Sequence, residues 1–177
     1  MNLEISKELV DAINDQINFE LYSGYIYLSM ATWFESRNLR GMAHWMEVQA
    51  DEEYNHAIRF HRHVTERGGR TLLKEIRTPR TEWGSPLEVF EDALNHERTV
   101  TERIYKIGEI AERLGDRATQ SFLRWFYNEQ VEEEKNATEN RDLIKMAKDS
   151  IPALLHIDAR LGGRKPAGPA PSESNKD

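Results

Sequence analysis

Acidic side chains interrupt apolar stripes in this 177-residue sequence, and their types and spacing are those of metal ligands. The segment Glu53-x-x-His56 puts a carboxylate and an imidazole on one helical face, one turn apart. The segment Gln130-x-x-Glu133 repeats the spacing with oxygen ligands only. Taken alone, a Glu-x-x-His segment is read more readily as an exposed charge pair, since charged residues mostly face solvent. The recurrence of acids on all four long stripes favours a metal site instead.

Each of four segments carries residues at alternating spacings of three and four, the pattern of a helix packed in a bundle. In each segment an acid stands where an apolar residue belongs, and no Lys or Arg lies on the stripes. The four stripes are Ile13, Ile17, Glu20, Gly24, Tyr27, Ala31 and Phe34; Met42, Met46, Gln49, Glu53, His56, Phe60 and His63; Phe90, Ala93, Glu97, Val100, Ile104, Ile107, Ala111 and Leu114; and Leu123, Phe126, Gln130, Glu133, Ala137, Asn140 and Ile144.

These acids are also expected to lie at one depth in the bundle. Helices joined by short turns run antiparallel, so counting residues from each turn gives their relative heights. The count puts Glu20 level with Glu53-x-x-His56, and Glu97 level with Gln130-x-x-Glu133. A buried carboxylate without a partner costs several kcal/mol, so the cluster needs a cationic counterpart. Two or more divalent or trivalent cations would supply it.

Start and stop signals predict five helices and no strands. Ser6 is a candidate N-cap, and Ser85-Pro86-Leu87-Glu88 is a capping box with proline at the first helical position. The prediction is an all-α four-helix bundle with a long crossover between helices 2 and 3 and a short fifth helix. We expect a turn at Ser36–Leu39, a stop at Gly68-Gly69 and a crossover at Arg70–Gly84. The third and fourth helices are expected to end at Leu114 and about Met146, and the fifth to span Ile151–Leu161. One domain is expected over residues 1–161, followed by a polar, Pro/Gly-rich, flexible tail over 162–177.

Composition narrows the possible partners. The chain has 24 Lys and Arg against 31 Asp and Glu, a net charge of −7, and the basic residues are scattered among acids. Nucleic acid and anionic membranes both require a basic face, so neither is expected as a partner. The absence of cysteine leaves His, Asp, Glu and Gln as the strong ligand types. No apolar run approaches the roughly 20 residues of a membrane span, and a cytoplasmic location is expected.

Several neighbours of the cluster have simpler interpretations. Tyr27 lies two turns beyond Glu20 on the same stripe and is either core filler or a donor of a hydrogen bond or an electron. The remaining polar and aromatic residues are expected to serve in hydrogen bonding, at the surface or in packing. They are Gln49, His63 and Asn140 as hydrogen-bonded residues, His44, His61, His96 and His156 as surface or packing residues, and Trp33, Trp45 and Trp83 as packing residues.

Longer segments, which together cover nearly the whole chain, carry a resemblance to a known family. NFELYSGYIYLSM, QADEEYNHAIRFHRHVTERGG, TEWGSP, NHERTVTERI and FLRWFYNEQVEEEK resemble segments of the non-haem ferritins of bacteria and archaea, members of the ferritin-like di-iron superfamily. The resemblance implies three iron positions. They are Glu20, Glu53 and His56 for the first; Glu53 as bridge, Glu97 and Glu133, with Gln130 alongside, for the second; and Glu52, Glu129, Glu132 and Glu133 for a third.

The resemblance implies a ferroxidase that stores iron. Fe²⁺ would be oxidised by dioxygen or peroxide and kept as a ferric oxyhydroxide mineral inside a homo-oligomeric shell of two dozen subunits. A di-iron oxidase with a fixed metal cofactor is one alternative, and a purely structural helical bundle that binds no metal is another. The iron content per chain separates the three. No haem is expected, because Tyr54 stands where haem-binding relatives carry a methionine. Gln130-x-x-Glu133 replaces the second Glu-x-x-His segment of other di-iron proteins, so the second position is expected to hold Fe²⁺ more loosely.

Overall fold

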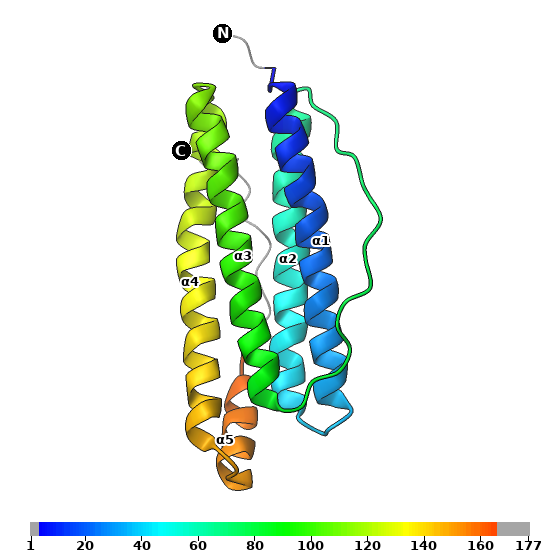
Figure 1. The fold of residues 1–177 in the computed structure, drawn as a ribbon, viewed down its shortest axis with the longest axis vertical. Helices are drawn as coiled ribbons and strands as arrows, with labels where there is room; N and C mark the ends of the chain where they lie inside the picture. Colours follow the sequence, from blue (N-terminus) through cyan, green and yellow to red (C-terminus); the bar gives the residue numbers. More distant parts are fainter. Residues whose placement is uncertain (1–3, 166–177) are drawn as a thin grey trace.

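A computed structural model describes residues 4–165, and within that part of the chain it contains five helices and no strand. Figure 1 shows four long helices side by side, with α1 against α2 and α3 against α4. The all-α four-helix bundle with a short fifth helix is confirmed, and every helix end lies within about two residues of its predicted place. The helices are α1 (Lys7–Glu35), α2 (Arg40–Glu66), α3 (Pro86–Arg113), α4 (Arg117–Ala147) and α5 (Ile151–Leu161).

Side-chain caps explain where the helices begin. The Ser6 hydroxyl accepts from the Leu9 amide at 3.2 Å, and the Ser85 hydroxyl accepts from the Glu88 amide at 3.2 Å. Glu88 completes the predicted capping box, because its Oε2 accepts from the Gly84 amide at 2.6 Å. These caps satisfy amides that have no partner inside the helix. The starts of α1 and α3 are therefore encoded locally.

The crossover runs along the outside of α1 from the end of α2 to the start of α3 (Figure 1). Two asparagines of α1 bind its backbone in both directions. Asn14 donates to the Arg70 carbonyl at 3.0 Å and accepts from the Leu72 amide at 3.1 Å. Asn18 donates to the Leu72 carbonyl at 2.8 Å. These bonds give an irregular segment the partners that a helix would find within itself.

Two apolar clusters form the core, and a polar layer separates them. One contains Phe34, Met42 and Phe90, and the other contains Ile13 and Phe126. The predicted stripes face this interior, so the acids on them are buried between the clusters. Three stripe positions differ: Leu114, at the end of α3, is 40% exposed, whereas Gly24 and His63 are half-buried.

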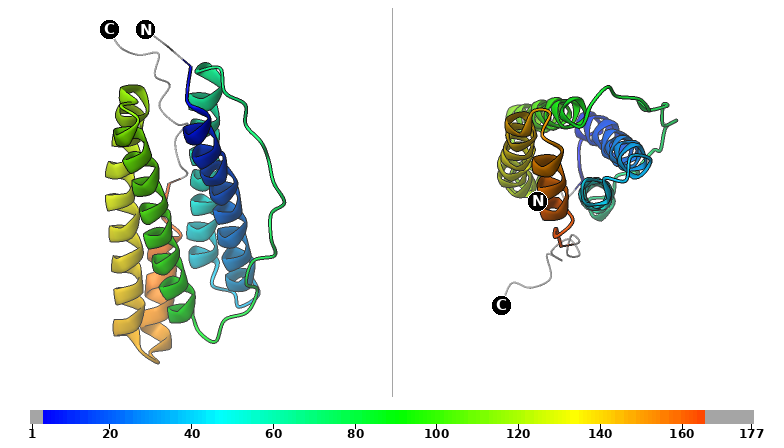
Figure 2. Two further views of the ribbon diagram at one scale, coloured as in Figure 1. Left: turned by 45° about the horizontal axis from the view of Figure 1, so that its top comes forward. Right: turned by 90° about the horizontal axis from the view of Figure 1, so that it is seen from below.

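The fifth helix lies across one end of the bundle and contacts α2 and α4 (Figure 2). Asp158 of α5 accepts from the Met42 amide at 2.8 Å and so caps α2, whose own N-cap residue, Leu39, makes no side-chain cap. After α5, Arg164 contacts His44, Trp45 and Glu52 of α2. The predicted domain boundary at residue 161 stays a prediction, and residues 166–177 of the predicted tail lie outside the described residues.

Candidate metal centre

The polar layer at mid-bundle gathers the acids that interrupt the four stripes. All of these side chains are at most 4% exposed, although they belong to four different helices. They are Glu20 and Tyr27 of α1, Glu53 and His56 of α2, Glu97 of α3, and Gln130 and Glu133 of α4. Four carboxyl groups thus share one water-poor layer, which is costly unless cations or protons balance them.

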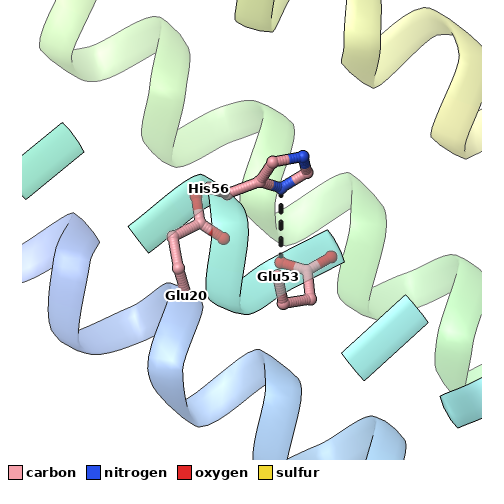
Figure 3. A group of neighbouring side chains, drawn as sticks. All are labelled: Glu20, Glu53 and His56. Carbon is pink, nitrogen blue, oxygen red and sulfur yellow. Dashed lines mark ion pairs between the residues drawn. The ribbon is translucent and has the colours of Figure 1, made fainter. Parts of the chain in front are cut away.

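Three of these residues form a group that fits a cation. Glu20, Glu53 and His56 each offer one ligand atom, and these three atoms all lie within 4.8 Å of one another (Figure 3). His56 Nδ1 lies 3.7 Å from Glu53 Oε2. Glu20 Oε2, both carboxylate oxygens of Glu53 and His56 Nδ1 have no hydrogen-bond partner among residues 4–165. Buried polar atoms without a hydrogen-bond partner are rare, and a bound cation would give each of these atoms a partner.

In the predicted second position Glu97, Gln130 and Glu133 take part in hydrogen bonds, unlike the bridging residue Glu53. The Tyr27 hydroxyl donates a hydrogen bond to Glu97 Oε1, and Gln130 Nε2 donates one to Glu97 Oε2 at 3.3 Å. Gln49 Nε2 donates to Glu133 Oε2 at 3.0 Å. Within the described chain, only the trio of Glu20, Glu53 and His56 converges as a ligand group. The second set therefore shares the layer without closing into a ligand cage.

Tyr27 is both a core residue and a hydrogen-bond donor in the structure. Its side chain is fully buried within an apolar cluster, and its hydroxyl donates to Glu97. Burial raises the pKa of Tyr27 well above 10, and the neighbouring charge of Glu97 raises it further. Tyr27 therefore stays protonated and able to donate that hydrogen bond at neutral pH.

The acids of the predicted third position lie on α2 and α4, beside the layer. Glu52 is ion-paired with Arg164, Glu129 is half-buried and Glu132 is exposed. Burial raises the pKa of Glu52, and the charge of Glu129 adds to that rise while Arg164 opposes it. Burial also raises the pKa of Glu129, with a contribution from the charge of Glu132. The three acids are electrostatic neighbours, but they do not converge on one point.

Burial dominates the electrostatics of the layer. It raises the pKa of Glu20 and of Glu53 well above 4.5, and each is raised further by a neighbouring carboxylate, Glu53 for Glu20 and Glu97 for Glu53. Burial, followed by the charge of Glu97, raises the pKa of Glu133 to about 8. Without a cation the layer therefore retains protons at neutral pH, and cation binding would release them.

The sequence did not reveal a chain of polar contacts that supports Glu20. Gln16 Nε2 donates to Glu20 Oε1 at 2.7 Å, and Arg103 Nε donates to Gln16 Oε1 at 2.9 Å. Gln16 precedes Glu20 by one helical turn, so its spacing was a usable signal. Arg103 comes from α3, and no local pattern connects it to α1.

The remaining histidines make contacts outside the ligand trio. Burial lowers the pKa of His63 to about 4 and that of His96 to about 4. His63 pairs with the Thr119 hydroxyl at 3.0 Å, and His96 pairs with the Ser23 hydroxyl at 2.7 Å. His44 and His61 are also hydrogen-bonded, and His156 is exposed. The tryptophans Trp33, Trp45 and Trp83 are buried, in agreement with a packing role.

Many four-helix bundles build a metal site in their core from carboxylate and imidazole side chains on facing helices, and the fold and cluster of this chain are of that class. Residues 10–147 match the family model of the ferritin-like domain. The chain belongs to the ferritin family. It is 43% identical over 160 residues to the bacterial non-heme ferritin of Bacteroides fragilis, which covers 90% of this chain and 99% of that protein.

Other relatives agree with this assignment. The bacterial non-heme ferritin of Staphylococcus aureus is 35% identical over 160 residues, covering 90% of this chain and 96% of that protein. The open pore ferritin of the archaeon Archaeoglobus fulgidus is 44% identical with a TM-score of 0.90, covering 92% of this chain and all of that one. No helix in the described part of this chain combines the length and apolarity needed to cross a membrane.

Proposed function

We propose that this protein oxidises Fe²⁺ at its buried cluster and stores the product as a ferric oxyhydroxide mineral inside a closed homo-oligomeric shell in the cytoplasm. The observation that carries the proposal is the trio of Glu20, Glu53 and His56, whose buried donor atoms lack other partners. An N/O ligand set of this kind suits Fe²⁺. The names of the relatives, non-heme ferritins, support iron as the cargo.

In this proposal two Fe²⁺ ions are substrates held side by side. Glu20, Glu53 and His56 hold the first, and Glu53, Glu97 and Glu133 hold the second, with Gln130 alongside. Each Fe²⁺ gives up one electron, and O₂ takes two electrons and two protons to become H₂O₂; with peroxide as oxidant, water is the product. The carboxyls with raised pKa lose their protons when cations bind, which keeps the charge of the layer balanced.

Tyr27 and Gln130 have a supporting part in the oxidation. Both donate to Glu97, so they orient this carboxylate before a cation arrives. Gln49 does the same for Glu133. These hydrogen bonds already use one lone pair on each oxygen of Glu97, whereas in the first position Glu20 Oε2, both oxygens of Glu53 and His56 Nδ1 have no hydrogen-bond partner among the described residues. The second position therefore fits a site that binds iron loosely and passes it on, with Glu52, Glu129 and Glu132 as the onward third position.

Assembly into a shell is supported by exposed apolar side chains on one side of the subunit. They come from α1, α2 and the crossover, and a single soluble chain has no use for so many in one region. A second copy of this chain is the proposed occupant of that surface, in a shell of two dozen subunits. The side chains are Tyr25, Leu28, Tyr54 and Ile76, which line one pocket together; the least exposed of them, Ile76, is still 41% exposed.

The test of the oxidation step is the Glu53→Gln variant. Glu53 belongs to both proposed positions, so its loss should slow the growth of ferric absorbance after air is admitted to anaerobic, Fe²⁺-loaded protein by at least about tenfold. One lost charged ligand contact of 1.4 kcal/mol or more gives that factor. Glu66→Gln, an exposed acid near the end of the same helix, is the control and should oxidise iron at the parent rate.

Two results would contradict the proposal. Parent protein that oxidises Fe²⁺ no faster than buffer would exclude the ferroxidase. Iron that saturates near two per chain, with no dense core in electron micrographs, would exclude storage and favour the alternative, an oxidase with a fixed di-iron cofactor. Loading with iron in large excess over ligand sites, followed by size exclusion, distinguishes these cases.

A further inference from the structure

Arg164 connects the segment after α5 to the side of α2 that carries the proposed third position. Its Nη2 donates to Glu52 Oε2 at 2.5 Å, and the two residues are 112 positions apart in sequence. Its Nη1 donates to the Trp45 carbonyl at 3.2 Å, and its guanidinium carbon lies 4.5 Å from the centroid of the Trp45 ring. The Arg164 carbonyl pairs with His44 Nε2 at 2.9 Å. Three residues of α2 therefore fix both the backbone and the charge of Arg164.

This contact is built into the fold and is not a loose surface pair. The side chain of Arg164 is 18% exposed and that of Glu52 is 20% exposed. Close docking of α5 brings Arg164 into place, because a Cβ on Gly41 would lie only 1.7 Å from the Asp158 carbonyl oxygen. Glycine at position 41 thus permits the approach, and the Asp158 carboxylate bonds to the Met42 amide.

The pair removes Glu52 from the carboxylates that are free to bind a cation. One oxygen of Glu52 accepts from the guanidinium, and the neighbouring positive charge offsets its negative charge. A cation at the third position would have to displace the guanidinium and would be repelled by it until then. Glu129 also lies near a positive charge, since burial raises its pKa and Arg59 opposes that rise, but the guanidinium of Arg164 is bonded to Glu52.

We propose that Arg164 is a latch on the third position. Its ion pair keeps Glu52 from binding a cation and so sets how tightly a cation binds there once the first and second positions are filled. Arg164 is a positioning residue, since it acts through Glu52. The proposal rests on the proposed function of the neighbouring first and second positions. In the latched form two cations bind per chain; when Arg164 swings away, Glu52 joins Glu129, Glu132 and Glu133 as an oxygen-rich site.

The test counts Zn²⁺, which cannot be oxidised, on the full-length assembled protein by equilibrium dialysis and titration calorimetry. Arg164→Ala should bind a third Zn²⁺ per chain at least about tenfold more tightly than the parent. Arg164→Lys keeps a charge and should give an intermediate affinity. Arg164→Gln removes the charge with less loss of packing, and serves if the alanine variant fails to assemble. Arg160→Ala, an exposed arginine of α5, is the matched control and should bind Zn²⁺ as the parent does.

A second substitution locates the gain. Adding Glu52→Gln to Arg164→Ala should abolish the third Zn²⁺, because the released ligand is then missing. Equal third-site affinity in the parent, Arg164→Ala and Arg164→Gln would overturn the latch and leave Arg164 as an anchor of the segment. Failure of the proposed function is separate: the parent would then bind no Zn²⁺ that Glu53→Gln removes.

Discussion

At the scale of single residues, the difference between Glu20 and Glu97 shows how hydrogen bonds divide one acidic layer into unlike sites. Glu20 keeps one oxygen free while Gln16 holds the other at 2.7 Å. Glu97 accepts from both Tyr27 and Gln130. Glu20 Oε2 has both of its lone pairs available to a cation, whereas each oxygen of Glu97 already uses one lone pair to accept a hydrogen bond. The first position is therefore preformed and the second is not.

Removing the support of Glu20 should weaken the first position. In Gln16→Leu the amide that lowers the pKa of Glu20 is lost, so that pKa should rise further and the carboxyl should hold its proton more firmly against a cation. A hydrogen bond to a charged group contributes about 1.5–3 kcal/mol, so we expect the tightest Zn²⁺ to bind about tenfold or more weakly by calorimetry. Gln120→Leu, whose amide bonds to the Ala111 carbonyl, is the control. Equal loss in both variants would show that Gln16 acts only through packing.

At the scale of elements, α2 depends on α5 for its first turn. Ser6, Ser85 and Asp116 cap their own helices, but the Met42 amide of α2 is satisfied by Asp158. A carboxylate at a helix N-terminus also interacts favourably with the helix dipole. The short α5 would be marginal alone, so its docking stabilises both helices. The same docking places Arg164 beside Glu52.

The Gly41→Ala variant tests this mutual dependence. Its Cβ would lie 1.7 Å from the carbonyl oxygen and 2.6 Å from the carbonyl carbon of Asp158, and backbone atoms cannot turn aside as a flexible side chain can. We expect α5 to undock, with amide hydrogen exchange over Ile151–Leu161 accelerating strongly and a loss of about 1–3 kcal/mol in the free energy of unfolding. Gly163→Ala meets the Arg160 carbonyl only at 3.3 Å and should change both far less. Unchanged protection of α5 in Gly41→Ala would refute the packing argument.

At the scale of the whole molecule, the buried acids make the stability of the cation-free protein depend on pH. The pKa of Glu133 is raised to about 8, whereas an unfolded glutamate ionises near 4.5. Between these values the folded protein holds more protons than the unfolded chain, so stability falls as pH rises. The pKa values of His63 and His96, lowered to about 4 from 6.5, act in the opposite direction below pH 6.5. Only above pH 6.5 is the fall in stability with rising pH therefore free of the effect of these histidines.

Thermal unfolding of metal-free protein should show this fall in stability between pH 6.5 and pH 8. Glu133 alone should lower the free energy of unfolding by about 1–2 kcal/mol across the window, at 1.36 kcal/mol per pH unit. Glu133→Gln should flatten the slope, and saturating Zn²⁺ should abolish the fall, since cations favour the ionised carboxyls. A midpoint that rises steadily from pH 6.5 to pH 8 without metal would show that the acids are not held protonated.

Local chemistry explains why the helices and the acidic layer could be predicted. Ser85 with Glu88 encodes the start of α3 within four residues, and the three-four spacing encodes which face of each helix is buried. Since an α-helix has a fixed rise per residue, the level of Glu20 with Glu53 also followed from counting. The sequence by itself therefore determined the bundle and brought the acids to one layer.

Contacts between distant segments were decided only by the tertiary structure. The Arg103 contact with Gln16 and the Arg164 contact with Glu52 depend on how α3 and α5 dock, and no local spacing encodes docking. Hydrogen bonding within the layer likewise depends on side-chain directions, which leave Glu53 free and occupy Glu97. Periodicity specifies which residues face the core, whereas the partner of each buried charge is set by packing across helices.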